Sequence, residues 1–463
     1  MFTEQPDRED TLRVAVVGSG PSGFYAAEAL LKSDAPRYRV DMFDRLPTPF
    51  GLVRGGVAPD HQKIKSVIKA YERIAESDRF RFFGNVLLGR DISADELSAR
   101  YHQVVLATGN ESDRRLGIAG EDLEGVYSAT EFVGWYNGHP DFRNREFALS
   151  GARNVVVVGN GNVAMDVVRI LAQNPDRLAD TDITDYALES LRESTIDKLT
   201  ILGRRGPAQS VFSPGEIKEL GSLESATLTL DPGALELGDV TKAWLENDAP
   251  RDAIKNLDYL RSVAESETEP KPRTVSCRFL ISPVELLGED GRLTAVRCER
   301  NELYARSNGE PRPRGTGEFE DIPADLVFKA IGYRGVPIPG VPFHERWGII
   351  PNALGRITES HEGPVRQGWY VVGWAKRGPT GLIGTNRADA KETVALMLED
   401  ADNGLALEPI ADETEALLKS RNVRLVTFAD WQLIDAEEIS RGAATGKVRE
   451  KFSIIADMLT LLG

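Results

Sequence analysis

A glycine-rich motif near the start of the chain carries the first recognisable chemistry. Gly18-x-Gly20-x-x-Gly23 lies between a short apolar run, 13–17, and an Ala-rich stretch, 24–32. A buried strand, a glycine turn and a helix in this order are the context that a dinucleotide requires. The first glycine permits the tight turn, the second lets the backbone approach a pyrophosphate, and the third lets the helix pack on the strand. We expect the pyrophosphate at the helix N-terminus, where free N–H groups favour an anion.

An acidic residue completes this motif. The next strand, 38–43, ends at Asp44, which is placed to accept hydrogen bonds from a ribose. A glycine turn that only joins strand to helix is the alternative, because the motif by itself is weak evidence. With both strands and the acid in register, the sequence predicts a bound dinucleotide.

The same pattern returns in the middle of the chain with a different ending. Residues 154–164 form a strand that runs into Gly159-x-Gly161-x-x-Ala164, followed by a helix over 165–172. The next strand, 198–202, ends in Gly203-Arg204-Arg205-Gly206, with arginines where the ribose-binding acid should be. Arginine here accommodates a 2′-phosphate. Two charge-assisted hydrogen bonds of about 1.5 kcal/mol each would favour NADP over NAD about 100-fold. A solvated surface pair is the alternative.

The elements that must position these motifs follow from the apolar pattern. Two fingerprints predict two nucleotide-binding domains. The strand 104–109 ends in a glycine, as strands beside a cofactor do in doubly wound folds. The segment 46–61 is irregular and rich in proline and glycine, 62–77 has the pattern of one amphipathic helix, and 80–88 has that of a strand.

The second half of the chain shows a return to the first domain. We expect an acidic helical excursion over 234–274, antiparallel strands at 278–280 and 293–298, the last strand of the second domain at 325–332, and a linker at 333–342. Residues 369–384 are a strand and a glycine turn, with a helix over 386–398. We expect this strand to rejoin the first domain, and the helical remainder to close it, with Trp431 in the core.

Composition narrows the function classes. The chain has 463 residues, a net charge of -16 and two cysteines. The negative charge disfavours nucleic acid and anionic membranes, and no apolar run is long enough to span a membrane. Cys277 and Cys298 form no CxxC pair, so a dithiol relay and a four-cysteine cluster of this chain are excluded. No metal site is expected, and the first dozen residues lack a targeting pattern, so the simplest location is cytoplasmic.

Two adjacent dinucleotide domains, the first of them split, suggest FAD in the first and NADP(H) in the second. The chemistry would be hydride transfer from nicotinamide to flavin across about 3–3.5 Å. Since the chain has no thiol pair, the electrons would leave for an external acceptor.

Four segments together resemble one family. They are 51–61 (GLVRGGVAPDH), 132–137 (FVGWYN), 203–207 (GRRGP) and 373–381 (GWAKRGPTG). They resemble the adrenodoxin-reductase-like ferredoxin–NADP+ reductases, most of all the actinobacterial branch, from about residue 14 to about residue 398. The resemblance implies an α/β fold of two Rossmann-like domains in three layers. FAD would bind to a discontinuous domain of 1–110 and 334–463, and NADP to 111–333. It implies NADPH-dependent reduction of a ferredoxin, often of the [2Fe–2S] type that feeds cytochromes P450.

The resemblance also implies site residues. Those for FAD are Gly18, Gly20, Pro21, Ser22, Gly23, Asp44, Arg45, Leu52, Thr108, Gly109, Trp374, Gly381, Leu382 and Ile383. Those for NADP are Gly159, Asn160, Asn162, Val163, Arg204, Arg205, Glu216 and Gly381. Many flavoproteins with two dinucleotide domains carry Gly-Asp where this chain has Gly373-Trp374, so contact with the flavin there would be by ring packing and backbone.

Three residues are candidates for steering protons or contacting nicotinamide. His61 and Asp166 would act near the flavin, and similar proteins place them close together. Ser213-Pro-Gly-Glu216 is a capping box, so a helix-start role explains Glu216 as well as a nicotinamide-side role does. A purely structural role is equally open for His61.

The expected partner is an acidic [2Fe–2S] ferredoxin or a similar protein. Because this chain is acidic too, docking would need a local basic patch. Lys376, Arg377 and Arg54 could contribute to it together with residues of the NADP domain. We expect a monomer or weak dimer.

Other functions fit less well. The NADPH-oxidising subunit of a glutamate-synthase-like complex shares the flavin core but usually carries an N-terminal cysteine cluster. A flavin disulfide reductase would need a close cysteine pair, and a flavin monooxygenase a substrate pocket that the sequence does not reveal. A non-catalytic nucleotide sensor is the alternative from another class, and failure to oxidise NADPH with any acceptor would favour it.

Overall fold

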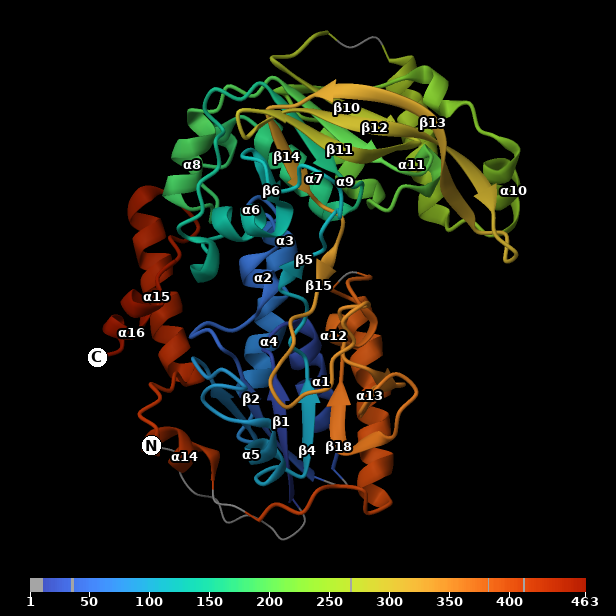
Figure 1. Cartoon of the computed structure of the whole chain (residues 1–463). Coiled ribbons are helices and arrows are strands. Elements are labelled where there is room, and N and C mark those ends of the chain that lie inside the picture. The colour runs from blue at the N-terminus through green and yellow to red at the C-terminus, as the bar shows by residue number, and fades with distance from the viewer. Residues whose placement is uncertain (1–10, 35–36, 267–268, 382, 411–412) are drawn as a thin grey trace. The chain divides into compact units, whose positions relative to one another are not determined.

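The computed structural model describes residues 11–34, 37–266, 269–381, 383–410 and 413–463. The chain forms two compact units. Unit 1 comprises Met1–Val57, His61–Ser112 and Tyr333–Gly463, and unit 2 comprises Ala58–Asp60 and Asp113–Gly332. Both are α/β units built on parallel strands, which confirms the predicted fold class (Figure 1). No described helix is long and apolar enough to cross a membrane.

Unit 1 is built on a seven-stranded sheet in the order β16-β17-β18-β4-β1-β2-β3. Its strands are β1 (Thr11–Val17), β2 (Arg37–Phe43), β3 (Phe80–Phe83), β4 (Gln103–Leu106), β16 (Asn352–Ala353), β17 (Arg356–Thr358) and β18 (Val365–Val371). The strands from β18 to β3 run parallel, whereas β16 and β17 pair antiparallel. As the sequence predicts, the late strand β18 lies beside β4 in this sheet.

Helices cover this sheet and place the fingerprint. α1 (Pro21–Leu31) follows β1 directly and packs on α13 (Thr385–Asp402). The other helices of unit 1 are α2 (Leu52–Gly55), α3 (Gln62–Lys65), α4 (Ile68–Ala75), α5 (Ala94–Ser98), α12 (Trp374–Arg377), α14 (Thr414–Ser420), α15 (Phe428–Thr445) and α16 (Ile455–Leu461). Trp431 of α15 is buried in the core, as expected.

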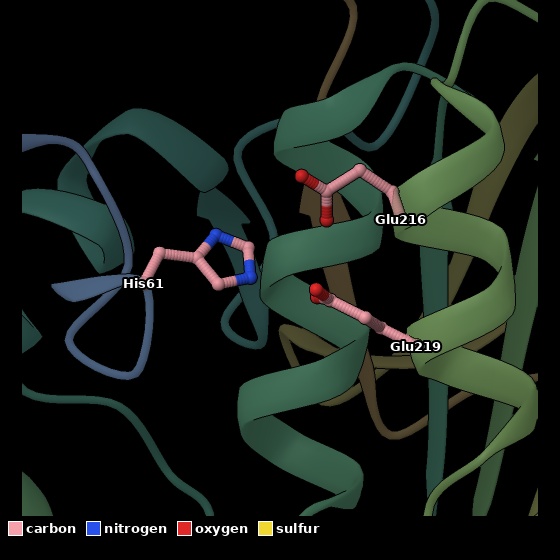
Figure 2. Close-up of side chains that lie close together, drawn as sticks. All are labelled: His61, Glu216 and Glu219. Carbon is pink, nitrogen blue, oxygen red and sulfur yellow. The ribbon is translucent and has the colours of Figure 1, made fainter. Parts of the chain in front are cut away.

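Two local predictions for unit 1 are wrong in their boundaries. The helix expected over 62–77 is broken into α3, which His61 precedes (Figure 2), and α4. The Ser66 hydroxyl bonds back to the Lys63 carbonyl at 2.6 Å, a competition with helix hydrogen bonding that interrupts the regular pattern. The strand expected over 80–88 ends at Phe83, after which Asn85 adopts a left-handed conformation, φ 61°.

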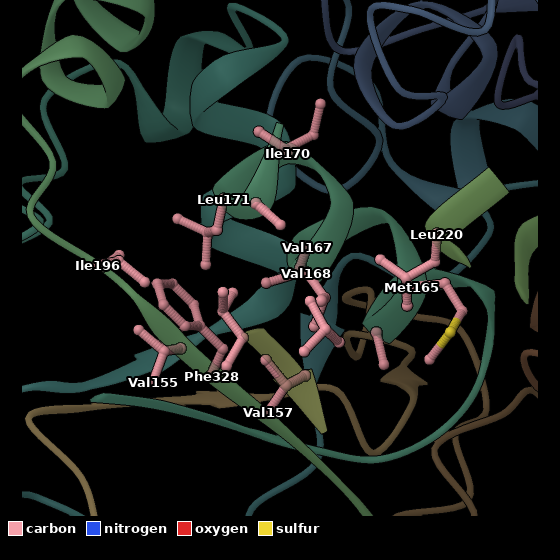
Figure 3. Close-up of a cluster of buried hydrophobic side chains, with 14 of the residues drawn as sticks. Val155, Val157, Met165, Val167, Val168, Ile170, Leu171, Ile196, Leu220 and Phe328 are labelled. Carbon is pink, nitrogen blue, oxygen red and sulfur yellow. The ribbon is translucent and has the colours of Figure 1, made fainter. Parts of the chain in front are cut away.

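Unit 2 is built on a six-stranded parallel sheet in the order β6-β14-β7-β8-β10-β9. Its strands are β6 (Val126–Ser128), β7 (Asn154–Val158), β8 (Lys198–Gly203), β9 (Ala226–Leu230), β10 (Arg273–Phe279) and β14 (Leu326–Lys329). Its α-helices are α6 (Ala129–Tyr136), α7 (Asn162–Ala172), α8 (Asp185–Arg192), α9 (Pro214–Gly221), α10 (Asp239–Asn247) and α11 (Arg251–Glu265). The apolar face of α7 packs on Val155, Val157 and Phe328 of the sheet (Figure 3).

A separate antiparallel sheet corrects a third prediction. Residues 278–280 do not pair with 293–298. Arg278 and Phe279 are the last residues of β10, which is parallel to β8 and β9, and Leu280 at φ 55° breaks the strand. The antiparallel sheet consists of β11 (Ile281–Glu289), β12 (Arg292–Ala305) and β13 (Pro311–Pro323). Two short strands, β5 (Ser112–Asp113) and β15 (Tyr333–Arg334), pair with each other.

Candidate nucleotide-binding sites

The first fingerprint has the shape that a pyrophosphate cradle requires. Gly18 has φ +107°, and a Cβ there would lie 2.3 Å from the Ala107 carbonyl oxygen. A Cβ on Gly23 would lie 2.0 Å from the Gly18 oxygen. A Cβ on Gly20 would meet nothing within 4 Å. Gly20 caps α1 without a side-chain hydrogen bond, and Pro21 follows it, so no capping side chain competes with an anion for the N–H groups of the first turn. These residues fit a bound dinucleotide.

Asp44 is held rigidly at the end of β2. One carboxylate oxygen accepts the Ser19 N–H at 3.0 Å and also bonds to the Ser19 hydroxyl, while the other accepts the Leu46 N–H at 2.9 Å. A carboxylate offers about four acceptor positions, so capacity remains for a ribose hydroxyl. Arg45 is engaged with Glu111 at 3.2 Å.

Two distant segments meet the first fingerprint within unit 1. The Phe50 N–H donates to the Ser19 carbonyl at 2.9 Å, and a Cβ on Gly51 would lie 2.9 Å from the Gly20 Cα. A Cβ on Gly373 would lie 2.0 Å from the Ser22 hydroxyl. The structure thus brings together the 50–56 segment, the fingerprint turn and the 373–381 motif.

The remaining FAD candidates of unit 1 lie around these segments. Leu52 begins α2 and is half-buried, Thr108 and Gly109 follow β4, and Ile383 packs partly against the core. Trp374 is the first residue of α12, and its ring lies tilted against the ring of Tyr333, with the ring centres 5.3 Å apart. Gly381 is exposed with φ +80°. Leu382 lies outside the described residues.

A residue that the sequence reasoning missed lies beside Gly109. Asn110 is 3% exposed, and neither its amide nitrogen nor its amide oxygen has a hydrogen-bond partner among the described residues. An unpaired buried amide is costly, so such a group points to a ligand that satisfies it. The signal was an asparagine directly after a strand-ending glycine.

The second fingerprint repeats the cradle in unit 2. Gly159 has φ +124°, and a Cβ there would lie 2.3 Å from the Ala330 carbonyl oxygen. Gly161 caps α7 without a side-chain hydrogen bond. The Asn162 side chain accepts the Ser213 N–H at 2.8 Å, which ties α7 to the start of α9. Val163 packs partly against the core, and the Asn160 amide lies against Gly203 at the end of β8.

The arginine pair follows β8 at the same edge. Arg204 is exposed and Arg205 is half-buried. Burial lowers the pKa of Arg205, and the charges of Arg204 and Arg312 lower it further, so three cations gather here. Arg312 of β13 bonds to Glu310 at 3.1 Å through Nη2, while its buried Nε has no partner among the described residues. Sequence reasoning missed Arg312, because nothing in the local pattern of β13 marks it.

The three proton-steering and nicotinamide candidates are divided between the units. His61 lies in unit 1 at the start of α3, whereas Asp166 and Glu216 lie in unit 2. Asp166 forms an ion pair with the buried Arg169, which also binds Asp60. Ala58–Asp60, assigned by sequence to the first domain, belongs to unit 2.

Glu216 lies in the first turn of α9, together with Glu219 further along the helix (Figure 2). Its N–H donates to the Ser213 hydroxyl at 3.4 Å, which confirms the capping interaction.

Both cysteines are buried and free. Burial raises the pKa of each thiol to about 12. Because the thiolate is the reactive form, neither residue supplies a nucleophile near neutral pH.

The three cations that we expected in a docking patch each have an acidic or polar partner within unit 1. Arg54 pairs with the buried Glu438 at 2.5 Å, and Lys376 pairs with Asp389 at 2.9 Å. Arg377 donates to Asn386 at 2.6 Å.

Comparison with known proteins gives a consistent picture. Residues 12–179 match the family model described as pyridine nucleotide-disulphide oxidoreductase. The chain is 46% identical over 462 residues to NADPH-ferredoxin reductase FprA of Mycobacterium tuberculosis, covering 97% of this chain and 98% of that protein. It is 43% identical over 473 residues to human mitochondrial NADPH:adrenodoxin oxidoreductase, covering 98% and 93%. The chain belongs to this family of NADPH-dependent ferredoxin and adrenodoxin reductases. The resemblance drawn from the four sequence segments is therefore confirmed.

A solved structure and a longer relative extend the comparison. The structure of Mycobacterium tuberculosis FprA in complex with NADPH matches with a TM-score of 0.90 at 44% identity, covering 98% of this chain and 100% of that chain. A Mycobacterium bovis protein named probable ferredoxin/ferredoxin–NADP reductase is 41% identical over 456 residues, covering 98% of this chain and 76% of that protein.

Proposed function

We propose that the chain is an NADPH:ferredoxin oxidoreductase that binds FAD in unit 1 and NADP(H) in unit 2. One observation carries the assignment: two uncapped glycine cradles of the same build, one closed by Asp44 and the other by Arg204 and Arg205. The relatives' names support NADPH as donor and ferredoxin as acceptor, and one of them joins a ferredoxin to the reductase in its name.

The chain's own residues would bind and orient the cofactors. The first turns of α1 and α7 hold the two pyrophosphates, Asp44 orients a ribose of FAD, and Arg204 and Arg205 hold the 2′-phosphate of NADP. When bound, the two cofactors supply hydride transfer from nicotinamide to flavin, followed by release of single electrons to ferredoxin. We propose Asn110 as a further contact to FAD and Arg312 as a further cation near the 2′-phosphate. We also propose that the remaining FAD and NADP residues expected from the family resemblance contact the cofactor assigned to them in the sequence analysis.

His61 and Asp166 are proposed to steer protons at the flavin, and Glu216 to contact the nicotinamide side. We expect His61→Gln to slow flavin reduction or ferredoxin turnover while FAD stays bound. Stopped-flow absorbance of the flavin measures this, and unchanged rates would refute the role of His61.

The finer features of partner and location are also proposals. We propose an acidic [2Fe–2S] ferredoxin as acceptor, a monomer or weak dimer, and a cytoplasmic location. The two free, buried cysteines are typical of proteins in a reducing compartment.

Anaerobic reduction of cytochrome c by NADPH, with and without an added [2Fe–2S] ferredoxin, tests the proposal. We expect a rate that rises steeply, saturates with ferredoxin and falls with added salt. A rate indifferent to ferredoxin would overturn the acceptor while leaving NADPH oxidation in place. Failure to oxidise NADPH with ferredoxin or with an artificial acceptor would favour the sensor alternative.

A further inference from the structure

Helix α15 carries a carboxylate in its buried stripe. The buried residues of this helix are Trp431, Ile434, Glu438 and Gly442, which share one face. Three of them are usual on a packed face, but Glu438 is 0% exposed. A charged group removed from water is tolerated only when it is fully paired. The partners of Glu438 therefore identify the segments of the chain that this helix holds in place.

Glu438 is saturated by four donors. Its two carboxylate oxygens accept the two Nη groups of Arg54, at 2.8 and 2.5 Å. One oxygen also accepts Arg449 Nη1 at 3.1 Å, and the other accepts the Phe452 N–H at 2.9 Å. Burial by itself would raise the pKa of Glu438, but the positive charges of Arg54 and Arg449 outweigh it and lower the pKa, so the carboxylate is charged.

The main partner, Arg54, belongs to the segment that contacts the first fingerprint. Its side chain is only 11% exposed, and its guanidinium lies 5.0 Å from the ring centre of Trp431, on the same face of α15. Lys451 donates to the Arg54 carbonyl at 3.3 Å. Both the side chain and the backbone of α2 are thus held by the C-terminal region.

The opposite side of this segment rests on the fingerprint turn. Phe50 has φ +84° and Gly51 has φ +49°, and the Phe50 N–H is bonded to the Ser19 carbonyl. A non-glycine residue persists in such a sparsely populated conformation only when its surroundings hold it there. Trp431 packs edge-on against Phe50 at 5.8 Å, which adds a second contact from α15.

We propose that Glu438 is a positioning residue for the flavin site. It acts through Arg54: the buried ion pair holds the segment Phe50–Gly56 against the Ser19–Gly20 turn, so that retention of FAD depends on a side chain of α15. This inference rests on the proposed binding of FAD in unit 1.

The test compares Glu438→Gln with Asp435→Asn in the full-length holoenzyme. Asp435 lies one turn earlier on α15 and pairs with Arg449 at 2.6 Å, but it has no contact with Arg54 among the described interactions. The rate of FAD release, followed by flavin fluorescence after dilution, should rise about tenfold in Glu438→Gln and less than twofold in Asp435→Asn. The visible flavin spectrum should shift only in Glu438→Gln. Affinity for 2′,5′-ADP, which reports on unit 2, should stay unchanged in both.

An unchanged release rate and spectrum in Glu438→Gln would overturn the proposal, as would equal effects in the two variants. Should Glu438→Gln fail to fold, Arg54→Lys keeps the charge but loses the bidentate contact. It should then release FAD several-fold faster, and unaltered release would again overturn the proposal. A wild-type chain that binds no FAD would instead overturn the proposed function, so the two failures are distinguishable.

Discussion

At the residue scale, the two nucleotide sites differ in one kind of side chain. Asp44 ends the second strand of unit 1 and is fixed by N–H groups of Ser19 and Leu46. Arg204 and Arg205 stand at the equivalent place in unit 2, joined by Arg312. A ribose hydroxyl donates to a carboxylate, whereas a phosphate requires cations. These few side chains therefore determine which nucleotide each unit prefers.

Replacing both arginines tests this choice directly. In Arg204→Ala/Arg205→Ala, the ratio of kcat/KM for NADPH to that for NADH should fall about 100-fold, because two charge-assisted hydrogen bonds are lost. Steady-state assays with an artificial acceptor measure the ratio. Arg300→Ala serves as a control, since this exposed arginine lies on β12. An unaltered ratio in the double variant would refute the assignment.

Replacing Asn110 should have opposite effects on the stability of the FAD-free protein and on the affinity for FAD. Since its buried amide has no partner among the described residues, Asn110→Leu should raise the melting temperature of the FAD-free protein. The same variant should bind FAD about tenfold more weakly, because a hydrogen bond to the cofactor is lost. Thermal unfolding and FAD titration of the apoprotein check the two effects. An unchanged affinity for FAD in Asn110→Leu would show that Asn110 does not contact FAD.

At the element scale, single carboxylates hold loops and short helices in place. Glu121 in unit 2 accepts the N–H groups of Leu116 and Gly117 at 2.9 and 3.0 Å, and Lys329 of β14 at 3.0 Å. Burial alone would raise its pKa, but these donors outweigh that effect and lower the pKa of Glu121 to about 2. The loop 116–121 is thereby fixed to β14.

This lowered pKa makes the stability of the loop depend on pH. A depressed carboxylate pKa stabilises the fold fully above the unfolded pKa of about 4.3, and the contribution is lost as pH falls toward 2. Glu121→Gln should therefore lose about 1–3 kcal/mol in urea unfolding at pH 7. The difference from wild type should shrink below pH 4. Asp122→Asn, whose side chain is 91% exposed, should show neither effect. A pH-independent difference for Glu121→Gln would contradict this account.

At the scale of the whole molecule, the chain offers two separate cradles in two compact units. Each unit has its own parallel sheet and its own buried core. A ligand stabilises the structure that binds it, by about 2.7 kcal/mol at 100 times its Kd. The response to each nucleotide should therefore be confined to the unit that binds it.

Hydrogen exchange tests this confinement. The nucleotide 2′,5′-ADP should slow amide exchange at the N-terminus of α7 and in the 203–206 turn, but not at the N-terminus of α1. The control is 5′-AMP, which lacks the 2′-phosphate and should protect the same amides much less. Equal protection of α1 by 2′,5′-ADP would contradict the assignment of the two sites.

The features that could be predicted from the sequence are those that a local pattern of residues indicates. Both glycine cradles, the acid after β2, the arginines after β8 and the late strand β18 were predicted, and the structure confirms these elements. Each was predicted from a backbone requirement or an apolar pattern that is visible in the residues of the motif itself. The four segments that resemble the reductase family belong to this class, and the comparisons confirm them.

Only the tertiary structure decided which distant side chains meet. Arg54, expected at the surface, is buried against Glu438, 384 residues later in the chain. Arg312 joins the arginine pair from β13, and the buried amide of Asn110 has no hydrogen-bond partner among the described residues. The reason is physical: the partner and burial of a polar group depend on how separate elements pack, and no local pattern encodes that packing.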